Sequence, residues 1–253
     1  MDQTVRGDTS GDGIDLSIVV PAGDQGRSLM TTLDAAAGAR RGLSSSVSEI
    51  IVVQDGDRLE TARAVASFAR DHPGTFLLRN PGSLGCGYSA RHGVLLSRGE
   101  RILLASPGIA FGEEQLREMA RLLSEGNDLV VASTGPNGTR PLPPVKIRKE
   151  LLARSVQTTL RLLSRQRVLR TCRFLHLYRR RAAFEIYRRQ RLDDASFVLE
   201  VLYLARRFRY SVFEVAHRDL EGTDLQTTDM TGSPAGIGQL VRIRMNRLRG
   251  DYG

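Results

Sequence analysis

The feature that most constrains the fold is an alternation of short apolar runs with longer amphipathic segments over the first 135 residues. The apolar runs are short and contain many β-branched side chains, which is typical of buried strands. They cover residues 16–20, 49–54, 75–79, 101–105 and 128–132, and the segments with helical spacing cover 26–41, 58–71, 88–97 and 113–124. Continuous apolar strands separated by helices predict a parallel sheet that is covered on both faces.

The second half of the chain follows a loop rich in Pro, Gly and Asn at residues 135–144. Its patterns predict a helix at 145–164, a strand at 174–178, a helix at 195–207, a strand at 210–215 and a basic amphipathic helix at 236–248. The first 13 residues are polar, and we expect them to be a disordered lead-in. Residues 14–253 are expected to form one domain, whose two halves cover 14–135 and 145–250.

The positive charge of the chain is concentrated in this second half. The formal net charge is +9, but residues 1–144 carry 14 basic and 17 acidic side chains, whereas residues 145–253 carry 23 basic and 11 acidic ones. A basic half attracts nucleic acid, anionic lipid head groups or phosphorylated substrates, and it also fits a surface that is merely solvated. No nucleic-acid motif occurs, aromatic residues make up 6% of the chain and Trp is absent, so no nucleic-acid partner is expected.

Several features predict a cytoplasmic protein. The two cysteines, Cys86 and Cys172, fit a reducing compartment better than a disulfide framework or a zinc site. The chain has no apolar run of about 18 residues, as a membrane span would need, and its start lacks the apolar core of a signal peptide. The basic helix at 236–248 leaves two interpretations open, which are peripheral contact with an anionic membrane and packing on the core.

Three stretches of the first half carry motifs at predicted strand ends. They are Ser17–Pro21 with the loop Ala22–Gln25, Ile51–Asp57, and Gly85–Gly93. In order and spacing, the landmarks over residues 15–250 resemble family-2 glycosyltransferases, and especially the synthases of polyprenyl (dolichyl) phosphate glucose or mannose. The resemblance implies a GT-A fold, which is a Rossmann-like α/β architecture with a mostly parallel central sheet flanked by helices. It also implies sugar transfer from a nucleotide-sugar donor to a phosphate or hydroxyl acceptor, such as polyprenyl phosphate or another anionic acceptor.

The same resemblance implies that residues 14–135 are the nucleotide-binding half and that residues 145–250 are a basic acceptor-side half. It also locates a nucleotide-sugar site. In the family, the loop after the first strand holds the nucleotide, an acid at the position of Asp55 hydrogen-bonds the base, and the glycine-rich stretch contains an arginine, here Arg91. The implied site consists of Pro21, Ala22, Asp24, Asp55, Gly85, Arg91, Ser106 and Arg148. The chain departs from the family where the loop after Pro21 lacks an aromatic residue, where Gln54 replaces an acid and where Cys86 replaces a lysine.

The end of the fourth strand departs further, because Ser106-Pro107-Gly108 stands where the family has Asp-x-Asp. Neither serine nor glycine supplies the anionic oxygen that Mg²⁺ or Mn²⁺ prefers, and the four histidines lack ligand spacing. We therefore predict no metal site and expect metal dependence to be weak or absent. Because the donor fork of arginine suits phosphate oxygens, cationic side chains are candidates to replace the metal. They are Arg91, Arg148, Lys149 and Arg170, the last of which replaces a family acid.

The predicted catalytic residues are Glu200 and Asp194. A hydroxyl acceptor needs a general base, whereas a phosphate acceptor is already anionic. Asp193, Asp194 and Glu200 lie in the region where the family places acids, and Glu200 matches a family position. Asp194 has the alternative role of capping the helix that follows it. Because acids are lost at several motifs, a catalytically inactive homologue with a binding or scaffold role stays open as the alternative.

Overall fold

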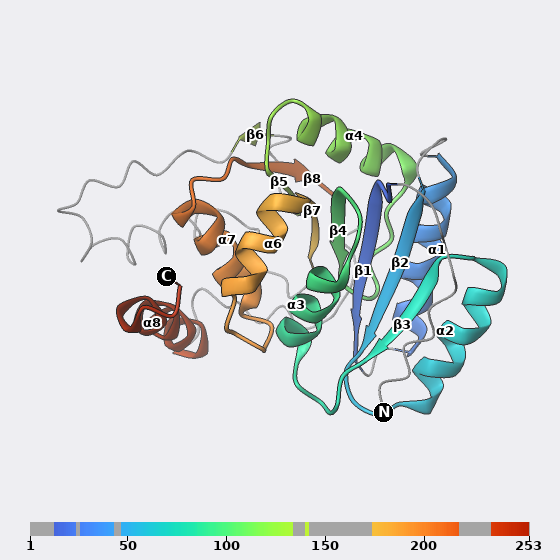
Figure 1. Cartoon of the computed structure of the whole chain (residues 1–253), viewed down its shortest axis with the longest axis horizontal. Helices are drawn as coiled ribbons and strands as arrows, with labels where there is room; N and C mark the ends of the chain where they lie inside the picture. The colour runs from blue at the N-terminus through green and yellow to red at the C-terminus, as the bar shows by residue number, and fades with distance from the viewer. Residues whose placement is uncertain are drawn as a thin grey trace.

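The computed structural model describes residues 13–23, 26–42, 47–133, 140–141, 174–217 and 234–252. They form a central sheet with helices packed against both faces (Figure 1). The predicted α/β architecture with a mostly parallel sheet is therefore confirmed. The predicted disordered lead-in and the predicted helix at 145–164 fall almost entirely outside the described residues.

The first half of the chain alternates strands and helices as predicted. Its strands are β1 (Leu16–Ala22), β2 (Ser48–Gln54), β3 (Thr75–Arg79), β4 (Arg101–Ala105) and β5 (Leu129–Ser133), and its helices are α1 (Gly26–Gly42), α2 (Leu59–Asp71), α3 (Cys86–Leu96) and α4 (Glu113–Ser124). The ends of α3 and β1 differ most from the prediction. The strand β1 continues through Pro21, at a point where its pairing with β4 has already ended.

The second half contains two elements that were not predicted from the sequence, β6 and α6. Its elements are β6 (Arg140–Pro141), β7 (Leu175–Arg179), α6 (Arg180–Arg189), α7 (Phe197–Arg207), β8 (Val212–Ala216) and α8 (Pro234–Arg249). Helix α6 buries Ala182, Ala183, Ile186 and Tyr187, which form a narrow stripe at helical spacing. The arginines at both ends of α6 obscured this stripe in the sequence.

The strand order is β3-β2-β1-β4-β7-β5-β8-β6. Strand β1 is buried along its whole length and pairs in parallel with β2 and β4, while β3 adds in parallel to β2. Strand β7 runs antiparallel between β4 and β5, and β8 runs parallel to β5. Because β1 to β4 are parallel, their carboxyl ends meet at one edge, where the strand order reverses between β1 and β4.

Two buried clusters hold the layers together, one on each face of the sheet. Residues of α1, α2 and α4, such as Leu33, Phe68 and Met119, pack on one face. Residues of α3, α6 and α7 pack on the other face, where Ile243 of α8 joins them. This arrangement leaves the carboxyl edge of the sheet bordered by the loops that lead into these helices.

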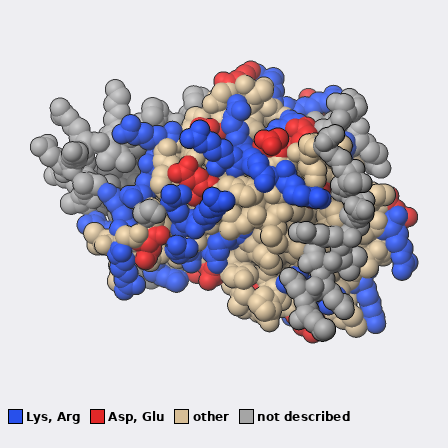
Figure 2. Space-filling model, viewed as in Figure 1, with Lys and Arg blue, Asp and Glu red and all other residues tan. Residues whose placement is uncertain are grey.

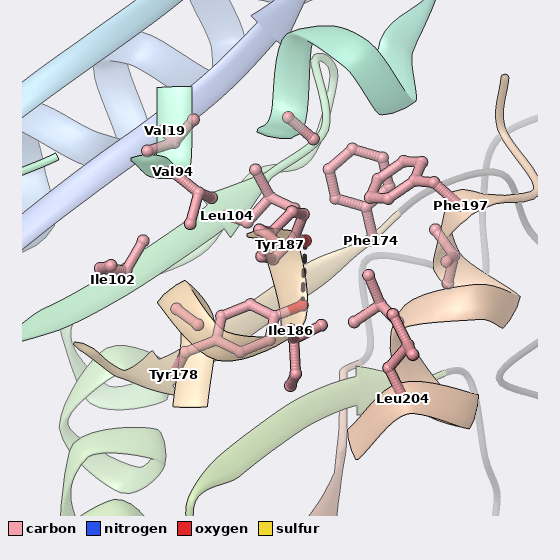
Figure 3. Packing of buried hydrophobic residues seen from close by; sticks show 14 of the residues in the cluster. Val19, Val94, Ile102, Leu104, Phe174, Tyr178, Ile186, Tyr187, Phe197 and Leu204 are labelled. Carbon is pink, nitrogen blue, oxygen red and sulfur yellow. Dashed lines mark hydrogen bonds between the residues drawn. The ribbon is translucent and has the colours of Figure 1, made fainter. Parts of the chain in front are cut away.

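The second cluster also contains a polar chain, part of which is visible in Figure 3. The hydroxyl groups of Tyr178 and Tyr187 lie 3.2 Å apart, and Nδ1 of His176 lies 3.0 Å from the Tyr178 hydroxyl. Burial lowers the pKa of His176 to about 3, so its ring is neutral at physiological pH. The chain satisfies polar atoms that would otherwise be costly in this core.

Candidate functional site

Four strand ends meet at the carboxyl edge of the sheet. Ala22 ends β1, Gln54 ends β2, Asn80 follows β3 and Ser106 follows β4. The N–H of Asp55 donates to the Ala22 carbonyl over 2.8 Å, and the N–H of Asn80 donates to the Gln54 carbonyl over 2.9 Å. Ligands of open α/β sheets bind outside the carboxyl ends of strands where the strand order reverses, so this edge is the candidate site.

Asp55 builds the turn that leads into α3. Its Oδ1 accepts hydrogen bonds from the N–H of Leu84 over 2.8 Å and from Nδ2 of Asn80 over 3.0 Å, and its Oδ2 accepts one from the N–H of Gly85 over 2.9 Å. Hydrogen bonds to an ionised carboxylate are stronger than those between neutral groups. The structure therefore brings Ala22, Asp55 and Gly85 together, and a contact between Asp55 and a nucleotide base stays a prediction.

Gln54, which replaces a family acid, also organises a loop. Its fully buried amide donates from Nε2 to the carbonyls of Gly56 over 3.0 Å and of Arg58 over 2.9 Å. An ionised carboxylate has no hydrogen to donate, so it could not make these two bonds. The substitution therefore fits the local backbone of this chain.

A polar network behind the turn was not predicted from the sequence. Asn80 is nearly buried, and its Nδ2 also donates to the Ser89 hydroxyl over 2.8 Å. Nδ1 of His92 lies 2.9 Å from Oδ1 of Asn80. Because a carboxamide oxygen only accepts, His92 carries its hydrogen on Nδ1. An asparagine directly after a strand was the available signal for this network.

The glycines that carry the family resemblance allow close packing. Gly85 has a φ of +99°, and a Cβ there would lie 2.3 Å from the carbonyl oxygen of Asp193. A Cβ on Gly87 would lie 2.2 Å from the carbonyl oxygen of Leu192, and a Cβ on Gly93 would lie 2.5 Å from Val19. Residues 190–194, which we call the 190–194 segment, thus lie directly against the start of α3.

The same segment caps α3. The carbonyl of Asp193 accepts the N–H groups of Gly87 over 2.7 Å and of Tyr88 over 3.3 Å. These are among the first N–H groups of the helix, which have no partner within it. The first N–H groups of α3 therefore bind a carbonyl of the protein, although the family resemblance places the nucleotide-sugar site beside this end of the helix.

Arg91 connects α3 to the 190–194 segment. Its guanidinium donates to Oε1 of Gln190 over 2.8 Å, to the Gln190 carbonyl over 3.2 Å and to Oδ1 of Asp193 over 2.8 Å, and it stacks on Tyr88 at 5.1 Å. The Asp193 side chain is 51% exposed. A phosphate oxygen that displaced Asp193 would find a guanidinium already oriented by Gln190 and Tyr88.

The end of β4 does not fit a divalent cation. Ser106 is nearly buried, its N–H donates to the Phe174 carbonyl over 2.8 Å, and its hydroxyl lies 3.4 Å from the Phe174 N–H. The N–H of Gly108 donates to the Ser28 carbonyl over 2.7 Å. No carboxylate stands in this turn, and the described residues contain no cluster of three His, Cys, Asp or Glu side chains that could hold a metal.

Glu200 lies in α7 and is fully buried. Its Oε2 accepts the N–H groups of Arg191 over 3.0 Å and of Leu192 over 2.8 Å, and its Oε1 accepts the hydroxyl of Tyr252. Burial raises the pKa of Glu200, and the hydrogen bonds from Tyr252 and the two backbone groups oppose this effect. Both oxygens are occupied by the protein, and the role of general base stays a prediction.

Asp194 lies at the surface immediately before α7. Its Oδ1 accepts the N–H of Ser196 over 2.8 Å, its carbonyl accepts the N–H of Phe197 over 3.1 Å, and its Oδ2 lies 3.5 Å from Arg242. The side chain of Asp194 thus closes a turn ahead of the helix, whereas the N-cap position of α7 is Ser196, where no side chain makes a capping bond. Its side chain is 47% exposed, so an oxygen can still be reached from solvent.

The remaining predicted site residues divide into two groups. Pro21 is buried in β1 beside Val53 of β2. Asp24, Arg148, Lys149 and Arg170 lie outside the described residues. The sequence did not identify Asn80, Gln190 or Tyr252. For Gln190 and Tyr252 the reason is that Arg91 and Glu200, with which they bond, lie far away in the chain.

Comparisons with known proteins give a consistent result. The model of the family described as Glycosyl transferase family 2 matches residues 17–186. A dolichyl-phosphate beta-glucosyltransferase of Trichomonas vaginalis is 25% identical over 85% of this chain and 69% of its own length. A dolichyl-phosphate beta-glucosyltransferase of Dictyostelium discoideum is 26% identical over 94% of this chain and 76% of its own length.

Solved structures share the fold at low sequence identity. Glucosyl-3-phosphoglycerate synthase from Mycobacterium tuberculosis, in complex with uridine-diphosphate, superposes with a TM-score of 0.61 and 16% identity over 91% of this chain and 80% of that chain. S. aureus TarS in complex with UDP-GlcNAc gives a TM-score of 0.53 and 17% identity over 83% of this chain and 60% of that chain. The present chain therefore spans less than two thirds of the TarS structure.

Proposed function

Because the chain belongs to glycosyl transferase family 2, we propose that it transfers a sugar from a nucleotide-sugar donor bound at the carboxyl edge of β1 to β4. The observation that carries the proposal is the turn ahead of α3, where Asp55 holds the backbone at the carboxyl edge of the parallel strands. The proposed donor site comprises Pro21, Ala22, Asp24, Asp55, Gly85, Arg91, Ser106 and Arg148. Relatives with bound uridine nucleotides share this fold, which supports the choice of donor class.

In the proposed reaction, an acceptor oxygen forms a bond to the anomeric carbon of the sugar. The bond from that carbon to the diphosphate breaks, and its electron pair leaves with the diphosphate. Negative charge develops on this leaving group, so oriented cations there accelerate the reaction. When the donor binds, the guanidinium of Arg91 leaves Asp193 and donates to a diphosphate oxygen instead. Arg148 is the second proposed cation. No step is assigned to a metal, because the turn at Ser106 offers no carboxylate.

The proposed acceptor is a polyprenyl phosphate. Two relatives that align with most of this chain are named dolichyl-phosphate beta-glucosyltransferases. A phosphate oxygen is already anionic, so transfer to it does not require a general base. For a hydroxyl acceptor, the exposed carboxylate of Asp194 would accept the proton of the acceptor hydroxyl, whereas Glu200 would first have to release its present partners.

Peripheral membrane contact is part of the proposal. Among the helices described here, none combines the length and apolar character that a bilayer crossing requires. Helix α8 buries Ile243 and leaves Met245 and Leu248 exposed, with Arg244 and Arg249 beside them on the helix. Figure 2 shows basic side chains gathered over the part of the molecule that contains α6, α7 and α8. Exposed apolar side chains flanked by arginines suit an anionic membrane surface.

The proposal is tested with sugar nucleotides of UDP, GDP, CDP and dTDP, a short-chain polyprenyl phosphate and either Mg²⁺ or EDTA. We expect one donor to raise the melting temperature and to yield glycosylated lipid, with little change in EDTA. Loss of turnover in EDTA would refute metal independence. A donor that binds without transfer to lipid phosphate or to hydroxyl acceptors would support the inactive homologue. If none of the donors binds, the proposed function is wrong.

A further inference from the structure

A tyrosine that follows α8 reaches the buried acid of α7. Tyr252 is almost fully buried, and its hydroxyl donates to Oε1 of Glu200. Nδ2 of Asn246 donates to the same hydroxyl over 3.3 Å, and the ring of Tyr252 lies 6.1 Å from the ring of Tyr203. Tyr252 is therefore fixed by two hydrogen-bond partners and by packing against α7.

The other oxygen of Glu200 holds the 190–194 segment. Oε2 accepts the N–H groups of Arg191 and Leu192, so one carboxylate joins Tyr252 to two consecutive backbone groups. Helix α8 makes a second contact with the same segment through Arg242, whose Nη1 lies 3.5 Å from Oδ2 of Asp194. That second contact is exposed and weak, whereas the contact through Glu200 is buried.

The 190–194 segment in turn shapes the candidate donor site. Its carbonyls at Leu192 and Asp193 lie against Gly87 and Gly85, and its polar groups at Gln190 and Asp193 orient the Arg91 guanidinium. A continuous path of contacts thus runs from Tyr252 through Glu200 and the segment to Arg91. Catalytic groups need supporting residues that hold them within a fraction of an ångström.

We infer that Tyr252 and Glu200 are positioning residues that hold the 190–194 segment against α3 and thereby set the affinity of the site for the nucleotide-sugar donor. The inference rests on the proposed function for the identity of the ligand. The two residues do not touch the donor in this scheme, and they act through the segment and Arg91. The part of the chain that follows α7 would then control donor binding from a distance.

Substitutions of Tyr252 and of Glu200 remove different hydrogen bonds. In Tyr252→Phe, Oε1 of Glu200 loses its donor while remaining buried, which leaves an unsatisfied polar atom. In Glu200→Gln, the amide oxygen still accepts both backbone N–H groups, but the amide nitrogen only donates, so the Tyr252 hydroxyl loses the acceptor of its hydrogen. The glutamine variant therefore keeps both bonds to the 190–194 segment but loses the bond that the Tyr252 hydroxyl donates.

The first experiment measures donor binding and turnover for the wild type, Tyr252→Phe and the matched control Tyr203→Phe. We expect Tyr252→Phe to raise the dissociation constant and KM for the donor roughly tenfold with a smaller change in kcat, since leaving a buried acceptor without its donor has about this effect. Tyr203→Phe should stay within roughly twofold of the wild type. Equal affinities for Tyr252→Phe and Tyr203→Phe would overturn the inference.

A second experiment does not depend on the donor. Hydrogen exchange reports the local opening of the N–H groups of Gly87, Tyr88, Arg191 and Leu192. We expect these groups to lose at least tenfold protection in Tyr252→Phe but not in Tyr203→Phe, and Glu200→Gln should retain most of it. Unchanged protection would show that Tyr252 does not hold the segment. Lost protection in Tyr252→Phe, together with a wild type that binds no sugar nucleotide, would support the positioning role while the proposed function fails.

Discussion

Gly87 is a residue whose identity is fixed by a neighbour rather than by its own helix. An alanine there would place its Cβ 2.2 Å from the Leu192 carbonyl oxygen and 2.9 Å from the backbone of Asp193. We expect Gly87→Ala to lower the free energy of unfolding by roughly 2–3 kcal/mol, as overpacking does, when urea unfolding is measured. Gly82→Ala is the control, because nothing lies within 4 Å of its Cβ position. Equal stability of the two variants would contradict the close approach of the 190–194 segment to α3.

The contribution of Glu200 to the free energy of unfolding is expected to depend on pH. Burial raises its pKa above the usual 4.5, so the folded protein holds the proton over a range where the unfolded chain has lost it. Its contribution to stability is fully present below the unfolded pKa and is lost as the pH rises through the folded pKa. We expect the difference in unfolding free energy between the wild type and Glu200→Gln to grow in favour of the variant as the pH rises above about 4.5. A difference that does not vary with pH would refute this.

Individual residues of the site were only partly predictable from the sequence. The positions of Asp55, Gly85 and Glu200 follow from the order of motifs along the chain. Their contacts do not, since Gly85 meets Asp193 and Glu200 meets Tyr252 across long sequence separations. A motif identifies which residue is unusual, and only the packed structure identifies what it touches.

At the scale of elements, the turn between β3 and α3 depends on one carboxylate. In Asp55→Asn, the side-chain NH2 group would face the N–H group of either Leu84 or Gly85. Both groups are donors, so that hydrogen bond would be lost. We expect the variant to lose about 2 kcal/mol of unfolding free energy, because hydrogen bonds to a charged group are replaced by weaker ones. Donor binding should weaken in parallel in calorimetric titrations. Asp57→Asn, which changes an exposed acid of the neighbouring loop, should alter neither quantity, and a similar loss there would argue against a specific role.

Elements were predicted well where burial is continuous and poorly where charge hides it. Strands β1, β2 and β4 are buried on both sides along nearly all of their length, so their sequences identify them directly. Helix α6 has a stripe of only four buried residues between clusters of arginine, and β6 has two residues. The antiparallel direction of β7 could not be predicted from the sequence either, because the direction of a strand depends on the connection that precedes it.

At the scale of the whole molecule, the uneven charge of the sequence becomes a surface property. The first half, which forms most of the sheet, is slightly acidic, and the second half places arginines on α6, α7 and α8. Several of these arginines have structural partners, such as Arg180, which donates to the carbonyls of Ser97 and Gly99 and stacks on Phe184. A basic composition therefore overstates the positive charge that is available to an external partner. Helix α8 combines exposed arginines with exposed apolar side chains.

This surface leads to a prediction about membranes. Leu248 is 76% exposed on α8, and arginines lie on both sides of it in the sequence, so we expect the protein to sediment with vesicles that contain anionic lipid and to be released by salt. Leu248→Asp should weaken sedimentation at least fivefold, because it removes apolar contact and adds like charge to the lipid. Leu59→Asp, at a 60% exposed leucine of α2, should bind as the wild type does. Equal losses in both variants would indicate a general charge effect. If neither the wild type nor Leu59→Asp binds the vesicles, α8 is not a membrane contact under these conditions.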